Sequence, residues 1–327
     1  MSSRTPVALV GPTASGKSTL ALALAGLRTD VELVSVDSMA VYRGMDIGTA
    51  KPSAAQRMAV PYHLVDLVDP SEEFSVRQFQ GAARQVLAEI EGRRHRALLV
   101  GGTGLYVRAV VDDLELPGRW PQIARELEVQ ADGPGGMEAL FSRLRALDPL
   151  AATRMEKGNR RRVVRALEVT LGSGRPFSSF GPGLEAYPPS PVTLVGIRFD
   201  PAVHDVLIER RFQALLEAGF LDEVRALAGR PGGMSRTARQ ALGYRELLAH
   251  IEDGLSLDEA VTAAVNRTRS FARRQWSWFK RDPRIQWLEP HSDLLAGLVD
   301  VFDRAGSDAP VVVADHAVVA DAAAVGD

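Results

Sequence analysis

The N-terminal part of the chain alternates short apolar runs with segments in which apolar side chains recur every three or four residues. The runs at residues 7–10, 31–36 and 97–100 have the length and composition of buried strands. Residues 18–27 and 79–91 carry the three-and-four spacing that predicts amphipathic helices. Strands that alternate with helices in this way are typical of a parallel α/β sheet.

The pattern changes after a short predicted helix at residues 105–111. The segment that follows is predicted to be helical throughout, apart from breaks at glycine and proline clusters, of which the longest spans residues 172–191. The apolar run at 192–199 then resembles a strand that returns to the sheet, and further helices follow. We therefore predict an α/β core. It is formed by residues 1–112 and 192–304 and is interrupted by an inserted all-helical domain at 113–191.

Composition places the chain among ordinary globular proteins. Of its 327 residues, 46% are hydrophobic and 24% are charged, which excludes wholesale disorder. The C-terminal segment 305–327 differs, because it consists mainly of Ala, Val and Asp and contains no Lys or Arg. We expect this tail to be poorly ordered.

Net charge and cysteine content limit which cellular compartment and which binding partners fit the sequence. The net charge is −2, so any surface that binds nucleic acid must be local. The absence of cysteine excludes disulfides and thiol nucleophiles and is compatible with the cytoplasm, where we place the protein. The N-terminus has no signal-peptide pattern, and no run approaches the ~18 apolar residues of a spanning helix. We therefore expect no membrane partner.

The most specific motif is GPTASGKS at residues 11–18, which fits the phosphate-loop pattern G-x-x-x-x-G-K-[ST]. Its glycines let backbone N–H groups wrap a diphosphate, Lys17 adds a positive charge, and the Ser18 hydroxyl can bind Mg²⁺. The predicted strand before the motif and the predicted helix after it argue against a chance glycine turn. The motif predicts phosphate binding without identifying the phosphate. Its residues are Gly11, Pro12, Thr13, Ala14, Ser15, Gly16, Lys17 and Ser18.

Asp37 follows the second predicted strand and is the best-placed acid for chemistry at the sheet. A nucleoside triphosphatase carries a further acid at a strand end to hold Mg²⁺, but the strand at 97–100 runs into Gly-Gly-Thr103. Ligands of open α/β sheets bind at the carboxyl ends of strands, where Asp37 could hold a metal or act as a general base. The alternatives are a turn or cap role for Asp37 and a turn hydroxyl for Thr103. His63 has no second histidine at ligand spacing, and we interpret it as structural or substrate-lining.

Two basic segments are candidates for binding a polyanion. The first, RRRVVRALE at residues 160–168, predicts a helix with Val163 and Leu167 on one face and Arg161 and Arg165 on another. A charged helix face is usually a solvated surface. Here the charge is almost entirely positive, and its self-repulsion favours an anionic partner.

The second basic segment, residues 266–281, combines cations with aromatic side chains. Its arginines recur at intervals of seven, and Phe271 and Trp278 share another face; the arginines are Arg267, Arg274 and Arg281. Such a pattern suits RNA, whose phosphates need cations and whose bases stack on aromatic rings. The alternative is a pair of core aromatics beside a solvated edge.

Six motifs in chain order resemble those of the bacterial tRNA dimethylallyltransferases, also called tRNA isopentenyl transferases. They are GPTASGKS at residues 11–18, DSMAVYRGMDIGTAK at 37–51, GGTGLY at 101–106, RRVVRALE at 161–168, QALGYR at 240–245 and RRQWSWF at 273–279. The resemblance extends from about Val7 to about Phe302, and several of these motifs are specific to that family.

The resemblance implies transfer of a dimethylallyl group from dimethylallyl pyrophosphate to the exocyclic amine of an adenosine, with release of pyrophosphate. The adenosine would lie directly 3′ of the anticodon in tRNAs that read codons beginning with U. The implied fold is a P-loop NTPase-like parallel sheet core with an inserted helical domain that binds the anticodon stem-loop. Mg²⁺ is the implied cofactor, and we expect a monomer.

Motif positions also imply roles for individual residues. Asp37 would be the general base, with Lys17, Thr103 and Arg211 in the same catalytic site and Ser18 on the metal. The implied tRNA contacts are Asp37, Ser38, Met39, Ala40, Thr103, Arg161, Arg162, Val163, Val164, Arg165, Gln240, Gly243, Tyr244, Arg245, Arg273, Arg274, Gln275, Trp278 and Lys280. The chain departs from the family pattern at Ala124, Glu126 and Leu207, where the family usually has arginines.

Two other classes of function fit the phosphate loop. A small-molecule kinase would bind ATP there and use the helical insertion as a lid. A nucleotide-switched RNA-binding protein would use the loop without any transfer chemistry. ATP turnover would favour the kinase, and RNA affinity that changes with bound nucleotide would favour the switch.

Overall fold

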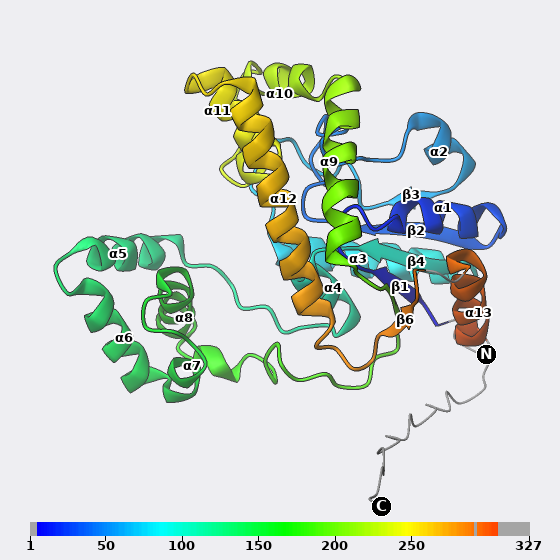
Figure 1. Cartoon of the computed structure of the whole chain (residues 1–327). Coiled ribbons are helices and arrows are strands. Elements are labelled where there is room, and N and C mark those ends of the chain that lie inside the picture. The colour runs from blue at the N-terminus through cyan, green and yellow to red at the C-terminus, as the bar shows by residue number, and fades with distance from the viewer. Residues whose placement is uncertain (1–4, 291–292, 307–327) are drawn as a thin grey trace, which may run out of the picture.

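The core of the protein is a parallel six-stranded sheet with helices on both faces (Figure 1). The structure is a computed structural model and describes residues 5–290 and 293–306. In the sheet the strands follow the order β3-β2-β4-β1-β5-β6. Their bounds are β1 Val7–Val10, β2 Val31–Val36, β3 Tyr62–His63, β4 Arg96–Gly101, β5 Thr193–Ile197 and β6 Gln286–Leu288. The predicted parallel α/β fold is confirmed.

The helices fall into three groups along the chain. The first group is α1 Lys17–Gly26, α2 Ala54–Ala59, α3 Val76–Gly92 and α4 Gly104–Val111. The second is α5 Pro121–Asp132, α6 Gly136–Leu147, α7 Pro149–Thr153 and α8 Arg160–Ser173. The third is α9 Pro201–Glu217, α10 Phe220–Ala228, α11 Tyr244–Glu252, α12 Leu257–Phe279 and α13 Leu294–Gly306.

Two features of this element order differ from the sequence pattern. The edge strands β3 and β6 were not expected, because two or three residues are too few to show an alternating period. The predicted tail begins too early, since Ala305 and Gly306 still belong to α13. Residues 307–327, the rest of that tail, lie outside the described residues. No helix in the described part of the chain is long and apolar enough to cross a membrane.

Alternate residues of the central strand β1 face two apolar layers. Val7 and Leu9 pack in a cluster with α1 and α13, whereas Ala8 and Val10 pack in a larger cluster with α3, α4 and α9 to α12. Both faces of the sheet are therefore covered by helices. This explains why the central strands consist of continuous apolar runs in the sequence. The carboxyl edge of the strands carries the loops described below.

Helices α5 to α8 form a unit beside the sheet with a core of its own, built from residues such as Leu127, Leu144 and Leu167. Two extended segments join this unit to the rest of the molecule (Figure 1). The helix breaks coincide with the glycine and proline clusters, and after Ser173 the chain returns to β5 with a single three-residue turn, Phe177–Ser179. The helical unit is therefore positioned by its two connections.

A cluster of buried charges fastens these connections to the core. Asp112, whose side chain is 1% exposed, pairs with Arg108 and lies 2.6 Å from Arg284. Arg108 also donates to the carbonyls of Leu184 and Ala186, and Arg284 donates to that of Pro188. Both ends of the helical unit are thus held by one carboxylate and two guanidinium groups.

We expect Asp112→Asn to destabilise the protein by about 3 kcal/mol, because it leaves the buried Arg108 guanidinium without its counter-charge and Arg284 with Asp282 alone. The neighbouring Asp113→Asn is the control, since Asp113 is 70% exposed and pairs with the exposed Arg84. That change should cost less than about 1 kcal/mol. Urea denaturation measures both values, and equal stability of the two variants would contradict the assigned role of Asp112.

Candidate functional site

Three loops meet at the carboxyl edge of the sheet. The phosphate loop follows β1, Asp37 follows β2, and Thr103 follows β4. Strand β4 lies between β2 and β1, and Gly101 at its end is in register with both Val36 and Val10. Parallel pairing therefore brings these three sequence-predicted segments to one place, as expected for ligands of open α/β sheets.

The phosphate loop has a backbone shape suited to binding an anion. Gly16 adopts a left-handed conformation with φ 81° directly before α1, and Ala14 is also left-handed with φ 60°. The start of α1 carries no side-chain cap and no acidic residue in its first turn. The N–H groups at this helix start are therefore left for an external anion.

Lys17 and Arg211 place two positive charges in this site. The Lys17 ammonium donates to the carbonyl oxygen of Pro12 at 2.5 Å and to the Ser15 hydroxyl at 3.3 Å. The pKa of Lys17 is lowered from 10.5 to about 7, mainly by burial and also by the charge of Arg211, while the charge of Asp37 opposes the shift. Burial also lowers the pKa of Arg211, again against Asp37. One acid and two partly desolvated bases form a site with an excess of positive charge.

Asp37 combines a structural contact with a free oxygen. Its Oδ1 accepts hydrogen bonds from the N–H groups of Met39 at 2.7 Å and Ala40 at 3.2 Å. The turn role considered for Asp37 is therefore real. Among the described residues no donor reaches Oδ2, which remains available to a substrate. Thr103 occupies the N-cap position of α4 without a side-chain cap bond, so its hydroxyl is likewise uncommitted there.

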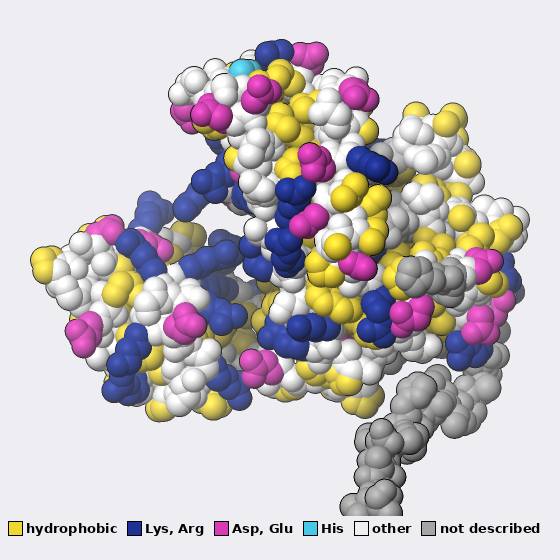
Figure 2. All heavy atoms as spheres, in the orientation of Figure 1, with side chains coloured by type: hydrophobic (Ala, Val, Ile, Leu, Met, Phe, Trp, Pro, Cys, Tyr) yellow, Lys and Arg dark blue, Asp and Glu magenta, His cyan; other side chains and the backbone are white. Residues whose placement is uncertain are grey.

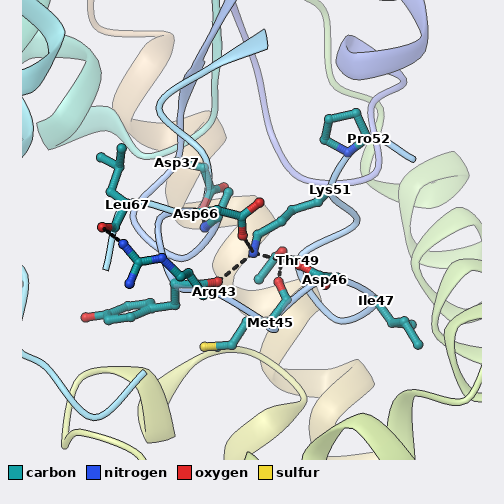
Figure 3. A network of polar contacts seen from close by, with 12 residues as sticks. Asp37, Arg43, Met45, Asp46, Ile47, Thr49, Lys51, Pro52, Asp66 and Leu67 are labelled. Atoms are coloured by element: carbon teal, nitrogen blue, oxygen red, sulfur yellow. Dashed lines mark hydrogen bonds and ion pairs between the residues drawn. The ribbon is translucent and has the colours of Figure 1, made fainter. Parts of the chain in front are cut away.

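The segment that follows Asp37 is held in place by Lys51 (Figure 3). The Lys51 ammonium, whose side chain is 1% exposed, donates to Asp46 at 2.8 Å, to Asp66 at 2.6 Å and to the carbonyl of Tyr42 at 2.5 Å. From the opposite side, Glu223 of α10 accepts hydrogen bonds from three successive backbone N–H groups at residues 46–48. Neither Lys51 nor Glu223 was assigned a role from the sequence, and the partners of Glu223 are more than 170 residues away in the chain.

A small pocket lies between the phosphate loop and helices α9 to α12. Its lining combines Thr13 and Ala14 of the phosphate loop and the charged Arg211 with several apolar side chains. The remaining lining residues are Gly48, Ile208, Phe212, Leu215, Phe220, Leu242 and Thr268. A Cβ atom on Gly48 would lie 2.2 Å from the Phe220 ring, so the close approach requires glycine. This pocket was not predicted from the sequence, because its apolar residues come from several separate segments.

The predicted RNA-binding residues of α8 divide into exposed and buried positions. Arg161 and Arg162 are exposed and their side chains form no ion pair with other described residues, whereas Arg165 pairs with Glu168. Val163 and Val164 are buried in the core of the helical unit at 0% and 4% exposure. Their side chains are therefore not accessible to tRNA in this conformation, and the tRNA contact predicted for Val163 and Val164 stays a prediction. They anchor the helix that presents the arginines.

The motif at residues 240–245 divides in the same way. Gln240 and Arg245 are exposed, whereas Gly243 is buried and Tyr244 is fully buried with its hydroxyl on Glu223 at 2.6 Å. The predicted RNA contact of the Tyr244 side chain is corrected accordingly. In the turn after β2, Ala40 is buried, and Ser38 and Met39 are half-buried.

Helix α12 carries exposed cations on one side and buried groups on the other. Arg273, Arg274 and Lys280 are exposed, but Arg273 already pairs with Asp205. Of the three arginines spaced by seven, Arg267 forms an ion pair with Glu246, so part of its charge is already neutralised within the protein. Of the other two predicted RNA contacts, Gln275 is 6% exposed, and the half-buried Trp278 packs over Gly104.

Basic side chains gather around the hollow between the helical unit and the sheet domain. Figure 2 shows dark blue Lys and Arg side chains on both of its sides, over the helical unit and along the lower part of the sheet domain. This local concentration contrasts with the net charge of −2 for the whole chain. Such a concave basic surface favours a polyanion over a small ligand.

His63 lies in an ionic cluster away from any metal site. Its Nε2 is 2.6 Å from Glu32, which also contacts Arg93 and His95. The hydrogen bond from Arg93, together with those from the two histidines, lowers the pKa of Glu32 to about 2 against the opposing effect of burial. In the described ranges no group of three or more His, Cys, Asp or Glu residues could hold a metal ion. His63 is structural, in agreement with one of the two interpretations.

Comparisons with known proteins agree with this geometry. A family model described as IPP transferase matches residues 40–282. The chain is 47% identical to a tRNA dimethylallyltransferase of Nocardioides sp. over 91% of this chain and 94% of that protein. It is 46% identical to a tRNA dimethylallyltransferase of Geobacter metallireducens, over 86% of this chain and 92% of that protein. A crystal structure of tRNA isopentenylpyrophosphate transferase from Bacillus halodurans is similar, with a TM-score of 0.65 and 34% identity, covering 92% and 98% of the two chains.

Binding of inorganic pyrophosphate should take up a proton at Lys17. Free Lys17, with a pKa of about 7, is largely neutral at pH 8.5, and a bound anion stabilises its protonated form. Affinity therefore falls as pH rises above 7. Lys17→Arg is the control because arginine stays protonated, while the titration of pyrophosphate itself is common to both proteins.

We expect the ratio of the association constants, parent over Lys17→Arg, to fall about tenfold between pH 7 and pH 8.5. Isothermal titration calorimetry in buffers of different ionisation enthalpy measures both the affinity and the proton uptake. A ratio that does not change with pH would show that Lys17 is already protonated in the free protein.

Proposed function

The chain belongs to the IPP transferase family, and from this we propose that it transfers a dimethylallyl group from dimethylallyl pyrophosphate to the exocyclic amine of an adenosine in tRNA. One observation carries the proposal: a phosphate loop, a carboxylate and an apolar pocket converge at one edge of the sheet, beside a basic hollow. Each part corresponds to one part of the two substrates.

The phosphate site fits a pyrophosphate ester better than a nucleoside triphosphate. Hydrolysis of ATP or GTP at a phosphate loop uses an acid at the end of a neighbouring strand to hold Mg²⁺. Here β4 ends in Gly101, Gly102 and Thr103, none of which carries a carboxylate. Transfer of a prenyl group needs stabilisation of a departing diphosphate but no attack on a γ-phosphate.

The pocket beside the loop suits the prenyl chain. Its apolar wall contains Ile208, Phe212 and Phe220, and its polar side contains Thr13 of the phosphate loop. A short hydrocarbon chain could occupy the apolar side while its diphosphate lies on the loop. Burial of the chain away from water would also protect the reacting carbon from hydrolysis.

Asp37, Lys17 and Arg211 account for the chemical step. The adenine amine attacks the first carbon of the dimethylallyl group as the bond from that carbon to the pyrophosphate oxygen breaks. Oδ2 of Asp37 accepts a hydrogen bond from the amine and takes its proton once the new carbon–nitrogen bond has formed. Lys17 and Arg211 stabilise the negative charge that develops on the leaving pyrophosphate. We propose that Thr103, which follows the neighbouring strand β4, positions the adenine base of the substrate.

The residues at the loop are compatible with Mg²⁺, which binds through few protein ligands and retains several waters. The Ser18 side chain lies on the exposed first turn of α1 and makes no hydrogen bond to other described residues. We propose that Ser18 and the pyrophosphate oxygens hold the ion, with Asp37 able to contact its water shell. Bound there, Mg²⁺ would supply further positive charge on the leaving group.

The RNA side of the proposal concerns the basic hollow. Exposed arginines of α8 and α12 would contact the phosphates of an anticodon stem-loop, and the target adenosine would leave the stack to reach Asp37. We propose the adenosine directly 3′ of the anticodon, in tRNAs that read codons beginning with U. We also propose that a monomer located in the cytoplasm suffices for the reaction.

The direct test is incubation of the protein with unmodified tRNA, Mg²⁺ and dimethylallyl pyrophosphate, followed by nucleoside mass spectrometry. The expected product is adenosine that carries one dimethylallyl group on its exocyclic amine. ATP replaces the prenyl donor in a parallel reaction. ATP turnover without prenylated nucleoside would contradict the proposal and support a kinase.

Asp37→Asn should lower the rate of prenyl transfer by about 10²- to 10⁴-fold, the range usual for loss of a general base. Asparagine keeps the Oδ1 contacts with the turn, so the local fold and the tRNA affinity should persist. Asp46→Asn, in the same segment, is the control and should lose less than about tenfold, because Asp46 is exposed and its ion pair is with Lys51, which has no role in the proposed chemical step. Single-turnover assays and tRNA binding measure the two effects. An Asp37→Asn protein within a few-fold of the parent would remove Asp37 from the mechanism.

Alanine at both Arg161 and Arg162 should weaken tRNA binding and flatten its dependence on salt. Each lost phosphate contact should reduce the slope of log affinity against log salt by about 0.7 to 0.9. Arg28→Ala combined with Arg304→Ala removes the same charge from the turn after α1 and from α13, elements that lie on the side of the molecule away from the helical unit (Figure 1). This control should leave the slope unchanged. Equal slopes for all three proteins would restore the solvated-surface interpretation of α8.

A further inference from the structure

Gln275 on the buried side of α12 joins two loops of the proposed active site. Its Oε1 accepts a hydrogen bond from the N–H of Thr13 at 2.8 Å, and its Nε2 donates to the carbonyl of Gly102 at 2.7 Å. Thr13 belongs to the phosphate loop, and Gly102 directly precedes Thr103. One amide side chain therefore connects the segment after β1 with the segment after β4.

Helix α12 packs so closely against the segment at residues 102–104 that two of its positions accommodate only glycine. A Cβ atom on Gly102 would lie 2.4 Å from Nε2 of Gln275, and one on Gly104 would lie 2.3 Å from the Trp278 ring. Gln275 is 6% exposed. Helix α12 thus fits against the segment at residues 102–104 through Gln275 and Trp278, which lie about one helical turn apart, and Gln275 also reaches the phosphate loop.

Gln275 cannot act as the direct RNA contact that the motif position implied, because its side chain is buried and both of its polar ends are occupied. The same helix presents Arg274 and Lys280 on its exposed side. A helix moves as a nearly rigid unit, so a shift of α12 when its exposed side binds RNA would be transmitted through Gln275 to both loops.

We propose that Gln275 is a positioning residue that sets the phosphate loop and Thr103 in a fixed relation to the RNA-facing helix α12. The proposal rests on the function proposed above. The Thr13 N–H is directed at Gln275, so the side chain fixes how the remaining loop N–H groups face a pyrophosphate. Loss of the amide leaves a buried donor at Thr13 and a buried acceptor at Gly102 without partners.

Gln275→Leu tests the connection, because leucine has a similar volume and no hydrogen-bonding group. Affinity for inorganic pyrophosphate in the absence of RNA should fall about tenfold, as expected for one lost hydrogen bond of the loop. The rate of prenyl transfer at saturating substrates should fall about 10²-fold, since small displacements of reacting groups are costly. Affinity for tRNA should stay within about threefold of the parent.

Gln275→Glu gives a second readout that a purely structural contact would not produce. An ionised glutamate can still accept from Thr13, but its other oxygen faces the Gly102 carbonyl and is repelled. A protonated glutamate can donate to that carbonyl and restores both bonds. The rate relative to the parent should therefore rise at least about tenfold as pH is lowered through the range in which this carboxyl takes up its proton.

The matched control is Arg274→Gln on the exposed side of the same helix. It should weaken tRNA binding and leave pyrophosphate affinity unchanged, the opposite of the Gln275 variants. A Gln275→Leu protein with parental pyrophosphate affinity and rate but weakened tRNA binding would overturn the proposal and return Gln275 to the RNA contacts. A rate ratio for Gln275→Glu that does not change with pH would also overturn it.

Failure of the proposed function can be told apart from failure of this inference. If the parent protein transfers no prenyl group to tRNA, the function fails. Pyrophosphate binding by the parent and by Gln275→Leu still reports on the connection, because that measurement needs neither RNA nor a prenyl donor.

Discussion

Parallel pairing of β2, β4 and β1 is the constraint on which the site depends. Because the three strands run in the same direction and in register, the segments that follow them emerge at one edge. Asp37, Thr103 and the phosphate loop are separated by tens of residues in sequence and become neighbours for this reason alone. The apolar layers on both faces hold the strands in that arrangement, so the chemistry rests on ordinary core packing.

Buried charged groups then fix the segments that core packing cannot reach. Lys51 and Glu223 hold the loop after β2 from two sides, and Asp112 with its two arginines holds both connections of the helical unit. Such pairs contribute little net stability compared with apolar packing, because burying the charges costs solvation energy. What they provide here is a defined geometry, since each charge is satisfied in one arrangement of the loops. Gln275 provides the same kind of constraint without charge.

The free site holds more positive than negative charge in partly desolvated surroundings. Burial lowers the pKa of both Lys17 and Arg211, the charge of Arg211 adds to the lowering at Lys17, and the charge of Asp37 opposes both shifts. A bound diphosphate relieves this imbalance, and so does the negative charge that grows on the leaving group during transfer. The excess positive charge raises the free energy of the site without ligand, and the same charge would stabilise the transition state of the transfer.

The sequence by itself determined the α/β class, the central strands and the phosphate loop, because these depend on local periodicity and on a contiguous motif. It also placed Asp37 correctly, since a residue that ends a buried strand must lie at the sheet edge. It did not determine which members of a motif face outward. Val163, Tyr244 and Gln275 lie in segments that resemble RNA-binding motifs, yet their side chains are buried.

The tertiary structure decided these orientations, together with the pairing of Arg267 with Glu246 and of Lys51 with Asp66. The apolar pocket likewise exists only where α9 to α12 meet the phosphate loop. The physical reason is the same in each case. Burial and ion pairing are set by contacts between segments far apart in the chain, and a local pattern carries no information about which distant segment will be the partner.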